Sequence, residues 1–120
     1  MKRVWLILPL ALLLGVAGQR IYHARKAAAA ARIRQCNLNL RLLGTAMKWY
    51  AIDNDGFPPA TLKQLVPIYT KNVPDCDCQT YQCEVVAKSY TLTCQSGHGD
   101  YPLPPHYPYA SSVRGLVVQP

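Results

Sequence analysis

Acidic residues are scarce in this chain and are missing from its first 52 residues. The 120-residue sequence holds 13 Lys and Arg against six Asp and Glu, and nine of the basic residues fall in that first stretch. The rest of the chain is slightly acidic. Because the positive charge follows an apolar segment and no nucleic-acid recognition motif is present, we expect anionic lipid head groups, and not nucleic acid, as its partner.

Motifs of the common catalytic classes are also missing. The sequence contains no GxSxG nucleophile elbow, no glycine-rich phosphate loop and no HExxH pattern. Six acids in so short a chain make a glycosidase-type carboxylate pair hard to nominate. His98 and His106 lie in a proline-rich tail, where exposed loop histidines are common. We therefore expect a protein without enzymatic activity or a cofactor.

The longest hydrophobic run is short for a membrane span. Residues 4–18 (VWLILPLALLLGVAG) are uncharged and follow Met1-Lys2-Arg3, as in an export signal. As a helix the run would measure roughly 22 Å, against roughly 30 Å for a hydrocarbon core. Small residues at 16–18 suit cleavage, whereas the arginines beyond them disfavour passage across the membrane. Residues 1–18 are thus a signal peptide or a membrane anchor, and the sequence leaves this choice open.

Both readings place the body outside the cytoplasm. An anchored chain would sit at the cell membrane and face the periplasm or the cell surface, whereas a cleaved chain would be secreted. Membrane contact through the N-terminal apolar segment is the partner that the sequence indicates most directly.

The stretch from Gln19 to Ile52 lacks proline and predicts a long helix. Residues 19–35 are basic and alanine-rich with little to bury, and we interpret them as a helical spacer before a globular domain at 36–120. In that domain an apolar stripe at spacings of three and four predicts a core-facing helix surface, namely Cys36, Leu40, Leu43, Met47, Tyr50 and Ala51. The helix should end near Asn54-Asp55-Gly56.

The second half of the chain is rich in proline and tyrosine, which predicts turns and loops around a small core. Thr61 and Gln64 have the spacing of a capping box, so a second, short helix should begin there. Its inward residues would be Leu62, Leu65 and Val66.

Two alternating segments, 81–86 and 89–94, flank Ala87-Lys88 and predict a β-hairpin with one buried face. The tail from Gly97 to Pro120 should be irregular, with a last edge strand at 116–118. The expected fold class is α+β, in which a long N-terminal helix packs on a small antiparallel sheet with a loop-rich, disulfide-stapled C-terminal region.

Five cysteines are present, and an exported chain makes disulfides the default. Cys76, Cys78, Cys83 and Cys94 allow three pairings, which sequence alone cannot distinguish. We prefer Cys76 with Cys94, which ties the incoming loop to the far strand, and Cys78 with Cys83, which closes a small local loop. Cys36 is left over, either as a buried apolar thiol or as a partner in an intermolecular bond.

A zinc site is the alternative use of these side chains. Cys76, Cys78, Cys83, Cys94 and His98 offer the soft ligands that zinc binds tetrahedrally. However, Cys-x-Cys followed by a cysteine after four residues does not match the paired Cys-x2-4-Cys ligands of structural zinc sites. We therefore expect no bound metal, and a small zinc-binding module is the less favoured function.

The segment NLRLLGTAMKWYAIDNDGFPPATLKQLVP resembles the pilin-like superfamily, and in particular the major pseudopilin of type II secretion. In these proteins a helix ends in a Tyr-x-x-Asp-Asn-Gly-x-Tyr/Phe-Pro turn, and a short helix with a Leu-x-x-Leu-Val pattern follows. The corresponding residues are Tyr50, Asp53, Asn54, Gly56, Phe57, Pro58, Leu62, Leu65 and Val66, with Asp55 inserted. The runs VPDC, SYTLTCQSGHGDYP and YPYASSVRGLV are similar to uncharacterised pilin-like bacterial proteins that place cysteines near Cys76 and Cys94.

The N-terminus departs from the pattern of a prepilin, which has a basic leader ending in Gly, then Phe or Met, and a Glu five residues into the apolar stretch. Here Gly15 and Gly18 lie inside or after the apolar run, and no acid precedes Asp53. The resemblance implies a non-enzymatic, membrane-associated structural or assembly component with protein partners or self-association. A secreted, disulfide-stabilised binding module is the alternative.

Overall fold

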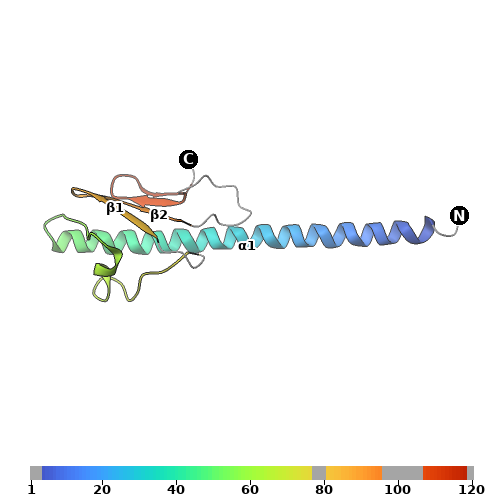
Figure 1. Cartoon of the computed structure of the whole chain (residues 1–120), viewed down its shortest axis with the longest axis horizontal. Helices are drawn as coiled ribbons and strands as arrows, with labels where there is room; N and C mark the ends of the chain where they lie inside the picture. Colours follow the sequence, from blue (N-terminus) through green and yellow to red (C-terminus); the bar gives the residue numbers. More distant parts are fainter. Residues whose placement is uncertain (1–3, 77–80, 96–106, 119–120) are drawn as a thin grey trace.

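The chain forms one long helix with a small sheet against its C-terminal half (Figure 1). The computed structural model describes residues 4–76, 81–95 and 107–118, except for the side chain of residue 4. The elements in chain order are helix α1 (Val4–Asp53), a 3₁₀ helix η1 (Leu62–Leu65), and strands β1 (Gln82–Val86), β2 (Ser89–Thr93), β3 (Tyr109–Ser111) and β4 (Gly115–Val117). The predicted α+β class is confirmed.

Helix α1 is continuous, so the apolar run and the predicted helix at 19–52 form a single element. It ends where the sequence predicts. The Gly56 N–H donates to the Ala51 carbonyl at 2.7 Å, and Asp55 and Gly56 have φ angles of 58° and 85°. Glycine adopts this left-handed conformation without strain, which is why it often follows the last helical residues.

The second predicted helix is only one 3₁₀ turn. The Thr61 N–H donates to Gln64 Oε1 at 3.2 Å, which is one arm of the expected capping box. Leu62 and Leu65 are buried as predicted, but Val66 is exposed, and the expectation that it faces inward is wrong. Pro67 follows directly and cannot donate the backbone hydrogen bond that a longer helix needs, so the turn ends at Leu65.

The sheet is an antiparallel meander with strand order β1-β2-β3-β4. The predicted hairpin is confirmed, because β1 and β2 flank Ala87-Lys88 and pair Cys83 with Leu92. The tail contains more regular structure than the sequence predicted. Strand β4 lies one residue before the expected edge strand, and β3, which was not predicted, pairs Ala110 with Leu92 of the hairpin.

The core lies between α1, η1 and one face of the sheet. Its fully buried large apolar side chains come from all three parts: Leu40, Leu43 and Met47 of α1, Leu65 of η1 and Leu92 of β2. The predicted stripe is therefore correct at its centre, and its end at Tyr50 and Ala51 is half-buried. Burial of about five such side chains, at roughly 1.5–3 kcal/mol each, is the main stabilising contribution available to so small a body.

Burial on α1 extends further toward the N-terminus than expected. Ala29 and Ile33 are buried, although they belong to the segment interpreted as a spacer with little to bury. They precede Cys36 by seven and three residues, so they continue the same helix face. The spacer is thus exposed on most of its surface but not on the face that leads into the core.

Three side-chain contacts show that the hairpin runs along the helix axis. The hydroxyl of Tyr81, just before β1, donates to the Cys36 carbonyl at 3.4 Å, and that of Tyr90 donates to the Gly44 carbonyl at 3.2 Å. Beyond them, Lys88 Nζ lies 4.9 Å from the centre of the Phe57 ring. The open end of the hairpin therefore lies near Cys36, and its turn lies near the C-terminal end of α1.

Leu43→Ala should destabilise the body far more than Leu42→Ala. Leu43 is 0% exposed and Leu42 is 49% exposed, so only the first substitution leaves a cavity. We expect a loss of about 2–5 kcal/mol for Leu43→Ala and under about 1 kcal/mol for Leu42→Ala. Denaturant unfolding of the full chain in a non-ionic detergent, followed by circular dichroism, measures both. Equal losses would contradict the packing of α1 described above.

Tyr81→Phe should lower the free energy of unfolding by about 1 kcal/mol, because the buried hydroxyl contacts Cys36 and phenylalanine keeps the ring but not the hydrogen bonds. Tyr69→Phe is the matched control. Its hydroxyl also donates a hydrogen bond, to Asp53 Oδ2 at 2.8 Å, but in an exposed place. The same unfolding measurement should give a smaller effect for Tyr69→Phe, and the reverse order would show that the Tyr81 hydroxyl does not join the hairpin to α1.

Candidate functional site

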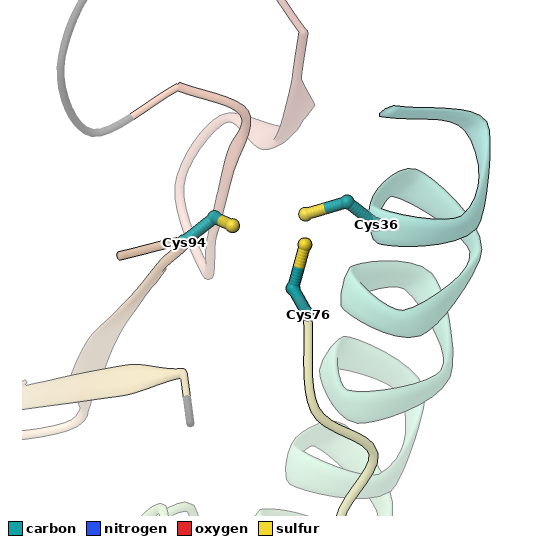
Figure 2. Close-up of side chains that lie close together, drawn as sticks. All are labelled: Cys36, Cys76 and Cys94. Atoms are coloured by element: carbon teal, nitrogen blue, oxygen red, sulfur yellow. The ribbon is translucent and has the colours of Figure 1, made fainter. Parts of the chain in front are cut away.

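Three cysteines far apart in the sequence meet at the open end of the hairpin. The Sγ atoms of Cys36, Cys76 and Cys94 all lie within 4.8 Å of one another. Figure 2 shows the three side chains directed toward a common point, from α1, from the loop before β1 and from the end of β2. All three residues are buried, at 0%, 5% and 2% exposure. We call these residues the thiol cluster.

The sequence places each of these side chains by a local rule. Cys36 lies on the core stripe of α1, four residues before Leu40. Cys94 follows β2 two residues after Leu92, so strand periodicity directs both toward the helix. Cys76 is positioned through the residue before it, because the buried Asn39 donates a hydrogen bond from Nδ2 to the Asp75 carbonyl at 3.4 Å.

A short hydrogen-bonded chain on α1 supports this position of the loop. Gln35 Nε2 donates to Asn39 Oδ1 at 3.0 Å, which orients the Asn39 amide so that its nitrogen faces the Asp75 carbonyl. Asn39 is the buried polar residue of the described core, and a buried amide without partners would be costly. Its hydrogen bonds therefore favour one arrangement of the loop that carries Cys76.

The surroundings of the cluster favour neutral thiols. Hydrogen bonding with Cys94, and then burial, raise the pKa of Cys36 far above its ordinary value. The Tyr81 hydroxyl, which donates to Cys36 Sγ at 3.4 Å, opposes this shift in the pKa of the thiol. Burial likewise raises the pKa of Tyr81 itself. The cluster is thus a buried set of three sulfurs with one phenol donor, and its surroundings favour the protonated form of Cys36.

The structure describes three of the four cysteines that are predicted to form disulfides, namely Cys76, Cys83 and Cys94. Cys76 and Cys94 lie close together, as their predicted pairing requires, although no disulfide joins any two of the four cysteines within the described residues. Cys83 lies outside the cluster, half-buried on β1, where burial raises the pKa of its thiol. Cys78, His98 and His106 fall outside the described residues, so the pairing of Cys78 with Cys83 stays a prediction.

The sequence did not predict that Cys36 belongs to the thiol cluster. The core stripe did place Cys36 on the helix face that packs on the sheet, and the alternation of β2 did place Cys94 on the buried face. What the sequence could not supply was the position of the strands along the helix. Without it, Cys36 was expected to be left over from the pairing of the other cysteines.

The cluster can support two kinds of chemistry. Oxidation would join two sulfurs at about 2.05 Å and leave one thiol beside the bond. Alternatively, three thiolates can bind one soft or borderline cation, and tetrahedral zinc with Zn–S bonds of about 2.3 Å would place its sulfurs about 3.8 Å apart. Sulfurs that already lie within 4.8 Å of one another need only small displacements for either outcome.

A second feature is a groove between α1 and the last two strands. Its volume is about 350 Å³, and its walls include Leu40, Tyr90 and Leu116, with Arg41 and Lys48 on the helix side. Among the described residues that line it, none is an acid, a histidine or a cysteine.

The architecture as a whole is pilin-like, since a long helix with an apolar N-terminal part is followed by a small antiparallel sheet. Comparison with known proteins found no matching family model, curated protein or solved structure.

Proposed function

We propose that the protein is a membrane-tethered, pilin-like structural or assembly component whose body lies outside the cytoplasm, and that it is not an enzyme. The observation that carries the proposal is the continuity of α1, which begins in an uncovered apolar segment and supplies the core of the body from its C-terminal half. A rigid connection of this kind fixes the body at a set distance from whatever surrounds the apolar segment.

The N-terminal part of α1 has the surface of a helix made for an apolar environment. It is long and apolar enough to cross a membrane, and none of its most apolar stretch is buried in the chain. Trp5 is 83% exposed, and the leucines between it and Gly15 are exposed as well. Such a surface is unfavourable in water, so it requires cover by lipid or by other helices.

The residues that flank this segment suit an anchor. Trp5 and Tyr22 lie about 25 Å apart along the helix, and aromatic side chains are typical of the two membrane interfaces. Arg25 and Lys26 follow, and Lys26 Nζ lies 6.0 Å from the centre of the Tyr22 ring. Counted to Tyr22, the segment is closer to the thickness of a hydrocarbon core than the uncharged run alone, and it includes Arg20, whose long side chain near the end of the segment can reach the interface.

A second apolar stripe supports an assembly role. Leu38, Leu42, Trp49 and Ile52 are 49–59% exposed and follow the heptad spacing of four, seven and three residues, with Thr45 between them. Each lies two residues beyond a core position, which is about 200° around the helix. A stripe with this spacing packs well against another helix, so it supports a helical protein partner or a second copy of this chain.

The alternative function is a secreted, disulfide-stabilised binding module. A signal sequence near the N-terminus meets the same criteria of helix length and apolar character as an anchor, and the uncharged run of residues 4–18 is short enough to be one. If it were removed near Gln19, the body would keep its core but lose its tether. The fate of residues 1–18 therefore distinguishes the two functions.

Leu12→Lys should release the chain from the membrane, whereas Leu42→Lys should not. Both leucines are exposed on α1, but only Leu12 lies within the apolar segment, where a lysine costs about 2.5–3.5 kcal/mol. The measurement is carbonate extraction of bacterial membranes, with intact-mass analysis of the wild-type chain and an alkaline phosphatase fusion after Pro120. We expect a membrane-bound wild type with an active fusion and with Met1 or its immediate neighbour at the N-terminus.

A mature N-terminus near Gln19 together with a soluble wild-type chain would replace the tether with the secreted module. An inactive phosphatase fusion, beside an active cytoplasmic reporter at the same position, would overturn the extracytoplasmic location itself. Equal release of the Leu12 and Leu42 variants would show that the apolar segment is not what holds the chain.

A further inference from the structure

The thiol cluster lies where three separate parts of the chain meet. Cys36 belongs to α1, Cys76 to the loop before β1, and Cys94 to the residue after β2. The pairing of β1 with β2 runs from Val86 and Ser89 at the turn to Gln82 and Thr93 at the open end, and Cys94 follows directly. A ligand held by all three sulfurs would therefore connect helix, loop and sheet at once.

We propose that Cys36, Cys76 and Cys94 bind one soft or borderline divalent cation of the zinc class through three thiolates. This site goes beyond the structural function proposed above and beyond the pairing expected from the sequence. The sequence argument against zinc considered the spacing of the four later cysteines, whereas the structure brings two of them, Cys76 and Cys94, together with Cys36. Spacing along the chain no longer bears on a site whose ligands come from three separate elements.

The number of sulfurs favours a cation over a disulfide. A disulfide uses two of the three thiols and leaves the third buried beside it. A cation uses all three, and their common orientation in Figure 2 matches that use. Zinc takes four ligands, so a water molecule or one further ligand completes the coordination.

Charge favours a divalent over a monovalent ion. Three thiolates with a divalent cation carry a net charge of −1, whereas a monovalent ion such as Cu(I) would leave −2 in the interior, which costs more to bury. The Tyr81 hydroxyl donates to Cys36 Sγ at 3.4 Å, and hydrogen bonds of this outer kind stabilise metal-bound thiolates.

The binding step involves no oxidation. Three S–H bonds break, three metal–sulfur bonds form, and three protons leave to solvent for each divalent ion bound. Because all three protons compete with the cation, apparent affinity should fall by up to about 1000-fold for each unit of decrease in pH below the thiol pKa values.

The test uses the full chain in detergent, reduced with a phosphine and kept free of oxygen. Zn²⁺ is titrated against a chromophoric chelator, and Cd²⁺ is added separately to detect thiolate-to-metal absorption in the ultraviolet. Alkylation before and after loading, read by peptide mass analysis, then shows which cysteines the cation protects. We expect one ion per chain, with Cys36, Cys76 and Cys94 protected and Cys83 still reactive.

Cys36→Ser should weaken binding by more than about 100-fold, and Tyr81→Phe by about 10-fold. Cys83→Ser is the matched control and should leave affinity unchanged, since Cys83 is a half-buried thiol outside the cluster. Circular dichroism checks that each variant is folded. If Cys36→Ser does not fold, the protection map and Tyr81→Phe decide the question.

Two results would overturn the proposal. The first is a chain that carries a disulfide between Cys76 and Cys94 when isolated from cells, or a folded, reduced chain that binds neither Zn²⁺ nor Cd²⁺. The second is an affinity that Cys36→Ser leaves unchanged, or a protection map that omits Cys36, because the ion would then be held by other residues.

Discussion

The packing of one face of α1 on one face of a four-stranded sheet is the interaction on which the rest of the structure depends. The body contains no second layer of helices within the described residues, so Leu40, Leu43 and Met47 must supply the helix side of its core. The sheet supplies Leu92 and Ala110, and η1 adds Leu65. A core this small tolerates little loss, because total stability of roughly 5 kcal/mol is comparable to the cost of one large cavity.

Because the core uses only one face of α1, the other surfaces of the helix are available for contacts with lipid or with other proteins. The core uses about one third of the circumference of α1, and the opposite face carries Leu38, Leu42, Trp49 and Ile52 in heptad spacing. Toward the N-terminus the helix is apolar on all sides, which is typical of a segment surrounded by lipid or by other helices. Helix α1 therefore has three surfaces, one suited to lipid, one that forms the core and one that can pack on another helix. Because the helix is continuous, these surfaces cannot rotate freely relative to one another.

The local parts of this fold could be predicted from the sequence, and the reasons are physical. The stripe from Cys36 to Met47, the Gly56 cap and the turn at Ala87-Lys88 each depend on residues within a few positions of one another. Strand β3 could not be predicted, because three residues show no convincing alternation and owe their conformation to pairing with β2. Val66 was assigned inward from helical spacing, which fails because the helix there is a single 3₁₀ turn.

The thiol cluster shows why sites are harder to predict than elements. The sequence gives the face of each cysteine, but Cys36 and Cys76 are forty residues apart, and only the axial position of the hairpin on α1 brings them together. That position is set by contacts such as Tyr81 to Cys36 and Tyr90 to Gly44, which no local pattern encodes. A cation bound at the cluster would fix the same axial position through three metal–sulfur bonds and would close two loops of the chain at once. The metal site and the axial position of the hairpin on α1 would then be coupled, because moving the hairpin along the helix by one strand residue, about 3.3 Å, would separate Cys94 from Cys36 and remove one of the three ligands.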